Sequence, residues 1–138
     1  MPSVTELDIW VRSTDLDADA IVNNARYFEF FEQVRIEHMI RLGMVVRPRP
    51  VGDHDRSITI AETTCRFKAP LRHRDVATVK CWTKEVRNRS FTLEFQMVLK
   101  GTGKLVAEGS SAQVWLDASG VPSPIPPDKK QRLMESIG

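Results

Sequence analysis

Hydrophobic and polar positions alternate along five segments of the chain. At residues 4–13 every second position is apolar, with Leu7, Ile9 and Val11 on one side, which predicts a half-buried strand. Four further strand patterns follow in the second half of the chain, at 57–67, 75–85, 90–100 and 104–116. Short turns join these later strands, and connections of hairpin length require antiparallel neighbours.

The pattern between the first two strands is helical. It runs from about Asn23 or Asn24 to Leu42, with Gly43 in the position expected of a C-cap, and either asparagine can cap its start. Its apolar residues occupy much of the circumference, which predicts a helix inside a sheet. We therefore expect an α+β fold in which an antiparallel β-sheet wraps around one long central α-helix, with residues 1–138 forming a single domain.

Two segments carry loop signals. Residues 44–56 contain Pro48 and Pro50 and end in a charged run, 53–56, which predicts an exposed and mobile loop. The tail is rich in proline, and we expect it to finish in a short polar segment.

Composition and charge exclude several classes of protein. The 138 residues are 41% hydrophobic and 28% charged with a net charge of +2, so there is no bulk electrostatic case for nucleic acid or an acidic membrane. The aromatic residues alternate with polar ones in strands rather than gathering on a basic face. The first ten residues have no signal-peptide pattern, and no stretch approaches the roughly 18 apolar residues that span a bilayer. We expect a cytoplasmic protein.

The cysteines and histidines do not have the spacing of a metal site. Cys65 and Cys81 lie on separate strands and are expected to be buried thiols rather than a disulfide, while His38, His54 and His73 are scattered. We therefore expect no metal and no redox cofactor.

Three acids, Asp15, Asp17 and Asp19, come just ahead of the predicted helix. A helix N-terminus offers free backbone N–H groups and a positive partial charge. A carboxylate there can act as nucleophile or general base while the amides polarise a carbonyl oxygen. The alternative is that these acids cap a turn and complement the helix dipole, and the spacing alone leaves both open.

A family resemblance starts in the same place. The run Asp15-x-Asp17-x-x-x-x-Val22-Asn23-Asn24-x-x-Tyr27-x-x-x-Phe31-Glu32-x-x-Arg35 resembles the signature of the hotdog-fold acyl-CoA thioesterases, in the 4-hydroxybenzoyl-CoA thioesterase-like branch. The segments Phe67-x-x-Pro70-Leu71-x-x-x-Asp75, Gln113-x-Trp115-x-Asp117 and Ile125-Pro126 are also similar to that family. The resemblance covers nearly the whole chain.

The resemblance implies a helix wrapped in an antiparallel sheet, and dimers whose sheets join, with active sites at the subunit interface. It makes Asp17 the catalytic carboxylate, which attacks the thioester carbonyl or activates water, and gives the backbone amides near Asn23 and Asn24 the oxyanion. Many relatives have Gly and His where this chain has Ala20 and Ile21; Ile21 also fits the 4-hydroxybenzoyl-type enzymes, and Ala20 is expected to tighten the turn.

Several residues keep two interpretations. Asp15 is expected to hydrogen-bond the turn, with a direct catalytic role as the alternative. Asn23 caps the helix or organises a substrate loop. Glu32 and Arg35 are three residues apart and can pair on one helix face. Glu32 has a second alternative, as a catalytic carboxylate, because other hotdog branches use an acid from the helix.

Basic residues gather at two places, around Pro70 and at the 87–89 turn. Arg and Lys at an exposed edge suit the phosphates of coenzyme A. The alternative for each is a solvated strand end. We assign five of them to the phosphates: Arg66, Lys68, Arg72, Arg74 and Arg89.

Together these features predict a homodimer or homotetramer that hydrolyses an acyl-CoA thioester to free acid and coenzyme A. Coenzyme A is part of the substrate, so no separate cofactor is expected. One alternative is a thioesterase acting on acyl groups carried by acyl-carrier-protein. The other is a non-catalytic hotdog protein that binds acyl groups.

Overall fold

The computed structural model describes residues 3–52 and 57–137. The elements in this part of the chain are β1 (Val4–Trp10), the short 3-10 turn η1 (Ser13–Asp15), α1 (Asn24–Arg41), β2 (Ile58–Phe67), β3 (Val76–Val86), β4 (Ser90–Leu99), β5 (Leu105–Trp115) and α2 (Pro127–Ile137). The predicted order of one strand, one long helix and four strands is confirmed. The charged run 53–56, predicted to be an exposed loop, lies outside the described residues.

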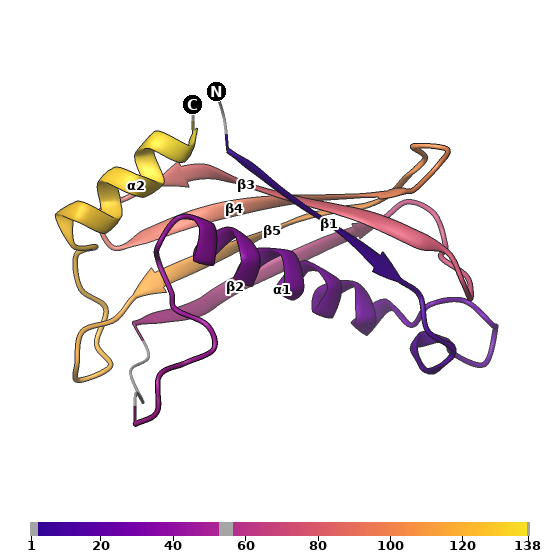
Figure 1. The fold of residues 1–138 in the computed structure, drawn as a ribbon, viewed down its shortest axis with the longest axis horizontal. Helices are drawn as coiled ribbons and strands as arrows, with labels where there is room; N and C mark the ends of the chain where they lie inside the picture. Colours follow the sequence, from indigo (N-terminus) through magenta and orange to yellow (C-terminus); the bar gives the residue numbers. More distant parts are fainter. Residues whose placement is uncertain (1–2, 53–56, 138) are drawn as a thin grey trace.

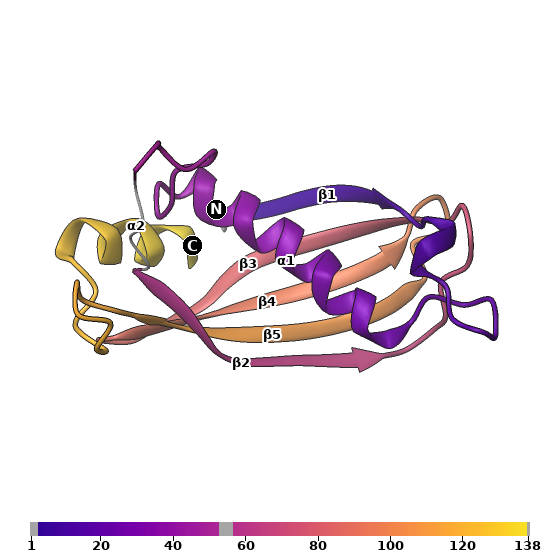
Figure 2. The same ribbon diagram turned by 90° about the horizontal axis from the view of Figure 1, so that it is seen from below.

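The five strands form one antiparallel sheet in the order β1-β3-β4-β5-β2. Hairpins join β3 to β4 and β4 to β5, as their short turns require. The helix carries the chain across the sheet, so that β1 and β2 become its two edges. Figures 1 and 2 show α1 running obliquely over one face, from the end of β2 to the start of β1.

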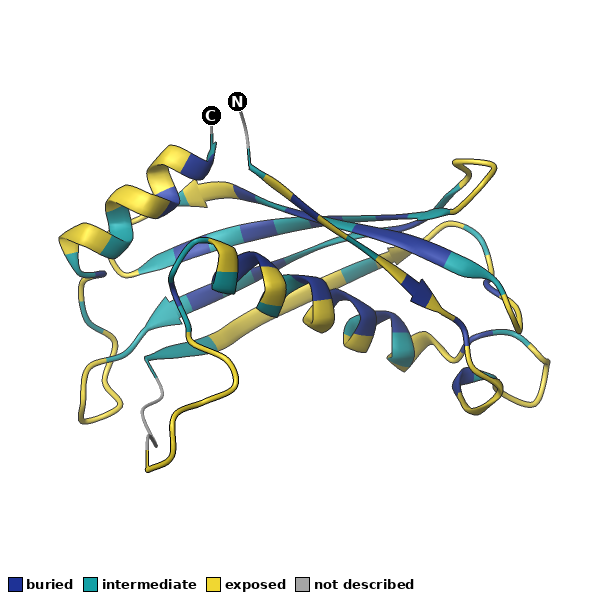
Figure 3. Cartoon of the chain, viewed as in Figure 1, coloured by how far each residue is buried: buried dark blue, intermediate teal, exposed yellow. Residues whose placement is uncertain are grey.

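The core lies between α1 and the inner face of the sheet. On β4 every second side chain is buried, as the alternation predicts: Phe91, Leu93, Phe95 and Met97. Figure 3 shows buried stretches both along α1 and along the strands of the sheet. Phe31 of the helix stacks on Phe95 with ring centroids 4.7 Å apart. Gly109 makes this close approach possible, because an added Cβ would overlap the Thr64 carbonyl and lie 2.7 Å from the Phe31 ring. Burial of each aromatic side chain is worth about 1.5–3 kcal/mol.

Both ends of α1 are capped as the sequence predicts. The Asn23 side chain accepts a hydrogen bond from the Ala25 amide at 3.0 Å. At the other end Gly43 has φ of 72°, and the amides of Gly43 and Met44 bond back to the Ile40 and Met39 carbonyls. This pair of bonds is a Schellman motif, which satisfies the last carbonyl groups of the helix.

The prediction of a single helix is incomplete, because the tail folds into α2. Pro127 stands at its first position, where the missing N–H costs nothing. Leu133 and Ser136 are buried against the rest of the protein. Only a short polar segment was expected here, because the apolar residues are few and prolines precede them. Its few apolar residues can be recognised as one face of a helix only from the surface that they cover.

The antiparallel pairing separates the molecule into two ends. One end holds the acidic turn, the start of α1 and the bend at Pro70. At this end Ala77 of β3 pairs with Leu99 of β4. The opposite end holds the 87–89 turn, where Val86 pairs with Phe91, together with α2 and the end of α1 (Figure 1).

None of the helices in the described residues has both the length and the apolar character needed to cross a membrane.

Candidate active site

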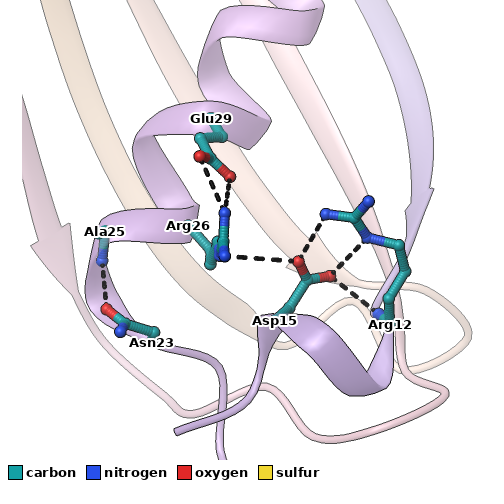
Figure 4. Close-up of polar contacts among 6 residues, drawn as sticks. All are labelled: Arg12, Asp15, Asn23, Ala25, Arg26 and Glu29. Atoms are coloured by element: carbon teal, nitrogen blue, oxygen red, sulfur yellow. Dashed lines mark hydrogen bonds and ion pairs between the residues drawn. The ribbon is translucent and has the colours of Figure 1, made fainter.

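Asp15 is buried just before the start of α1, although it carries a charge. Its carboxylate accepts hydrogen bonds from the Arg12 amide at 2.9 Å and from Arg12 Nη2 at 2.8 Å, and Arg26 Nε lies 3.9 Å away (Figure 4). Burial by itself raises the pKa of Asp15, but the Arg12 hydrogen bonds and the two positive charges outweigh it and hold the pKa below its ordinary value. Asp15 therefore forms the structural link that the sequence favoured.

Asp17 lies in a tight turn and is exposed to solvent. The turn is closed by the Asp17 amide bonding to the Ile21 carbonyl at 2.8 Å, and by the Ala20 amide bonding to the Asp17 carbonyl at 3.1 Å. The Asp17 carboxylate accepts the Asp19 amide at 2.8 Å, while the Asp19 side chain is exposed. Ala20 has φ of 62°, a left-handed conformation that favours glycine. The turn is therefore tight, as expected, and it holds Ala20 in a left-handed backbone conformation.

The turn is fixed to the helix start by the backbone. The Asn23 amide bonds to the Asp15 carbonyl at 2.9 Å, and the Val22 amide bonds to the Leu71 carbonyl at 2.8 Å. Asn24 is the first residue of the helix, and its amide has no hydrogen-bond partner within residues 3–52 and 57–137. An exposed carboxylate and an unused helix amide thus occupy the same short segment, seven residues apart.

An aromatic pair covers one side of this segment. Tyr27, in the first turn of the helix, meets Phe67 at the end of β2 edge-on, with ring centroids 5.0 Å apart. Tyr27 is buried and its burial raises the pKa of the hydroxyl, partly offset by the Leu71 backbone. Phe67 remains 43% exposed. The pair leaves an apolar surface beside the helix start.

The five residues assigned to phosphates do not form one cluster. Arg66 and Lys68 share the Glu108 carboxylate at 4.0 and 3.7 Å. The side chains of Arg72 and Arg74 make no ion pair within the described part of the chain. Arg89 lies on the turn after β3, at the opposite end of the sheet from Asp17.

The predicted Glu32–Arg35 ion pair does not form. Arg35 is half-buried, and burial lowers its pKa while the charge of Glu32 opposes that shift. Glu32 is exposed, and the pair that forms three residues apart on this helix is Arg26 with Glu29, at 2.9 Å. Nothing in this arrangement brings Glu32 to the Asp17 turn.

Both cysteines are free, with Cys81 buried and Cys65 half-buried. Burial raises the pKa of the Cys65 thiol to about 11, so it is a poor nucleophile at neutral pH. Among the described residues no group of three His, Cys, Asp or Glu side chains is arranged to hold a metal ion.

Sequence reasoning missed the arginines that hold Asp15. The spacing of Arg12 and Asp15, three residues apart across a turn, was an available signal. Arg26 had no such signal, because its approach to Asp15 depends on how α1 folds back beside the turn.

The comparisons with known proteins identify the family of this chain. The family model of the thioesterase-like superfamily matches residues 11–133, which span the Asp17 turn, α1 and the strands β2 to β5. The chain belongs to this superfamily. Membership confirms the predicted class of enzyme, a thioester hydrolase.

Individual relatives are distant. The chloroplastic acyl-acyl carrier protein thioesterase ATL3 of Arabidopsis thaliana is 25% identical over 137 residues, 99% of this chain and 71% of that protein. The structure of a gentisyl-coenzyme A thioesterase is 26% identical with a TM-score of 0.76, over 93% of this chain and 98% of that one. A 1,4-dihydroxy-2-naphthoyl-CoA thioesterase from Synechocystis shares the fold, with a TM-score of 0.84 at 12% identity, over 96% of this chain and 97% of that one.

Proposed function

We propose that this thioesterase hydrolyses an acyl-CoA thioester to the free acid and coenzyme A, with Asp17 as its catalytic carboxylate. The observation that carries the proposal is the exposed Asp17 turn fixed by backbone hydrogen bonds to the start of α1, where the Asn24 amide is unused. The similarity to a gentisyl-coenzyme A thioesterase favours coenzyme A as the carrier.

The chemistry follows from these groups in one of two ways. As a nucleophile, the Asp17 carboxylate adds to the thioester carbon, the carbon–sulfur bond breaks, and coenzyme A leaves as a thiolate. Water then cleaves the resulting acyl anhydride and restores the carboxylate. As a general base, Asp17 takes a proton from the water that attacks the same carbon, and the leaving thiolate receives the proton.

In either route the thioester oxygen becomes negatively charged. The amide of Asn24 at the helix N-terminus is the donor we assign to that oxygen, with Asn23 holding the helix start in place. Phe67 and Tyr27 supply an apolar surface beside it.

We propose an assembly through β2 that completes the site. In the described sheet β2 pairs only with β5, so its other edge is open. A second copy pairing antiparallel with that edge turns its own sheet end for end. The 87–89 turn of that copy then lies at the Asp17 end, which brings the partner's Arg89 to the same end as Arg72 and Arg74. A dimer and a tetramer both meet this requirement.

The experiment that tests the proposal compares Asp17→Asn with Asp19→Asn. We expect Asp17→Asn to lose about 10²–10⁴-fold in turnover of acyl-CoA, the usual contribution of a proton-transferring or nucleophilic group, with an unchanged circular dichroism spectrum. Release of free thiol is the measurement. Asp19→Asn changes the neighbouring exposed acid and should stay close to wild type. Near-normal turnover of Asp17→Asn would remove Asp17 from the mechanism.

The relative from Arabidopsis favours a second candidate, a thioesterase acting on acyl-carrier-protein. The chemistry at Asp17 is the same for both carriers. A direct comparison of the same acyl group on the two carriers separates them, because the preferred carrier has the higher kcat/KM. Tight acyl-CoA binding without hydrolysis across aromatic and aliphatic acyl groups would instead indicate a non-catalytic acyl-binding protein. The cytoplasmic location stays a prediction.

A further inference from the structure

A cavity lies at the end of the molecule opposite Asp17, between the last turn of α1 and α2. Its volume is about 370 Å³, within the range of small-molecule sites. Figure 2 shows the two helix ends that enclose it at the same end of the sheet. Its lining combines two arginines with an acid and short apolar and polar groups: Arg41, Arg132, Glu135, Ile40, Leu42 and Ser3.

Arg41 is fixed in this cavity by the first strand. Its Nη1 donates to the Val4 carbonyl at 2.9 Å and to Thr5 Oγ1 at 2.7 Å. These two bonds use one nitrogen of the guanidinium group. The remaining N–H groups have no acceptor among the described residues, so they are available to a ligand in a fixed orientation.

Arg132 is exposed, and its side chain packs against the end of α1. Its guanidinium group lies against Gly43, where an added Cβ would overlap Nη1. No carboxylate or carbonyl in the described part of the chain accepts a hydrogen bond from it. The acid nearest in the lining, Glu135, accepts one from Gln131 at 3.0 Å. Gly43 therefore has a second role beyond its helix-ending φ, because it makes room for a guanidinium group without a partner.

Positive charge exceeds negative charge around the cavity. Lys129 Nζ donates to the Gly43 carbonyl at 2.7 Å, which offsets the negative end of the α1 dipole. Two guanidinium groups with free donors in an open pocket can bind carboxylates and phosphates through paired, charge-assisted hydrogen bonds.

We propose that this cavity is a binding site for a small oxyanion, a carboxylate or a phosphate, held between Arg41 and Arg132. Ile40 and Leu42 are the apolar part of the lining, so a carboxylate with a short alkyl group has an additional contact there. Within one subunit the site lies at the end opposite Asp17, and it does not depend on thioester hydrolysis.

The test is a titration of the folded protein, followed by backbone amide NMR shifts, with inorganic phosphate, acetate and butyrate at constant ionic strength. We expect saturable shifts confined to residues 40–43 and 132–136. The two sources of oxyanion are told apart by rank: a phosphate site binds phosphate most tightly, and a carboxylate site binds butyrate more tightly than acetate.

Variants make the titration specific. Arg132→Gln should weaken binding about tenfold or more, the loss expected for charge-assisted hydrogen bonds, whereas Glu135→Gln should tighten it. Arg87→Gln is the matched control, since Arg87 is at the same end of the sheet but is paired with Glu85 at 3.0 Å. Asp17→Asn should bind as wild type does, which separates this site from the proposed hydrolysis. Shifts that do not saturate, or equal weakening by Arg132→Gln and Arg87→Gln, overturn the proposal.

Discussion

The two ends of α1 bury polar groups in opposite ways. Before its first turn, the charged carboxylate of Asp15 is buried and held by Arg12 and Arg26. In its last turns, the His38 ring is buried between two hydroxyl groups, Thr5 Oγ1 at 2.7 Å and Thr83 Oγ1 at 3.0 Å. One end uses charge pairing, and the other uses neutral hydrogen bonds.

The neutral end also fixes α2. The Ser136 hydroxyl donates to Thr83 Oγ1 at 2.7 Å, so a chain of buried hydroxyl groups joins both helices to β1 and β3. Burial lowers the pKa of His38 to about 4, and the nearby charge of Arg41 acts in the same direction. The ring is therefore neutral at physiological pH.

This difference bears on the chemistry proposed for Asp17. A buried charge is stable only with an opposite charge beside it, and that pairing makes Asp15 unavailable for reaction. Two residues later Asp17 is exposed, with a helix amide nearby and no arginine within ion-pair distance among the described residues. Asp15 and its arginines thus anchor the turn that carries the exposed Asp17 carboxylate. The hydroxyl groups around His38 complete the core at the other end of α1.

The largest effect on stability is expected from breaking the charged end. We expect Asp15→Ala to lower the free energy of unfolding by about 3 kcal/mol, the low end for a broken buried ion pair, because Arg12 and Arg26 can still reach water. Urea unfolding followed by tryptophan fluorescence measures it. Asp19→Ala is the control and should cost about 0.5 kcal/mol or less, since its side chain is exposed. Equal losses for the two variants would contradict the structural role of Asp15.

The neutral end predicts a different dependence on pH. The folded pKa of His38, about 4, lies below its ordinary value of 6.5, so between these values the unfolded chain binds more protons. The contribution of His38 to stability is complete above about pH 6.5 and is lost as the pH drops towards 4. We expect a loss of about 2 kcal/mol, reduced from the full pKa shift because the two hydroxyl groups can reorient around the charged ring. Asp15 also has a lowered pKa, but its contribution is lost only as the pH falls through the acidic range below about 4.

His38→Gln checks this directly. Glutamine can still bond both hydroxyl groups but does not titrate, so unfolding free energies measured across pH 4–7 should lose most of their slope. His73→Gln replaces an exposed histidine and should keep the wild-type slope. An unchanged slope in His38→Gln would show that other groups control acid stability.

Local patterns predicted much of the fold and part of the site. Alternation placed all five strands, and Asn23 and Gly43 marked both ends of α1, because these signals depend on residues close in sequence. The α2 helix was missed because its face is defined by the surface it covers. The three acids marked the acidic turn ahead of the helix, and the family resemblance singled out Asp17 among them.

Contacts that depend on how the elements are arranged in space could not be predicted from the sequence. The spacing of Glu32 and Arg35 predicted an ion pair, yet Arg35 is half-buried while Glu32 points to solvent. The five basic residues were assigned to the phosphates from two clusters, and the sequence did not show that the antiparallel register puts Arg89 at the far end of the sheet from the others. Arg26 and Arg132 gained their roles from elements that meet only after folding.

The smallest effect concerns the turn itself. Ala20 occupies a left-handed conformation, which costs about 1–2 kcal/mol for a residue with a Cβ. Glycine removes that cost but gains freedom in the unfolded chain worth about 0.4–1 kcal/mol, so Ala20→Gly should stabilise the protein by about 0.5 kcal/mol. Ala18 lies in the same turn but has no positive φ, so Ala18→Gly relieves no strain. It carries only the entropic cost and should destabilise the protein by a similar amount. Urea midpoints that shift in opposite directions would show that the contacts of Asp15 hold the acidic turn with Ala20 in its strained conformation. Shifts of the same sign would show that the turn relaxes without that strain.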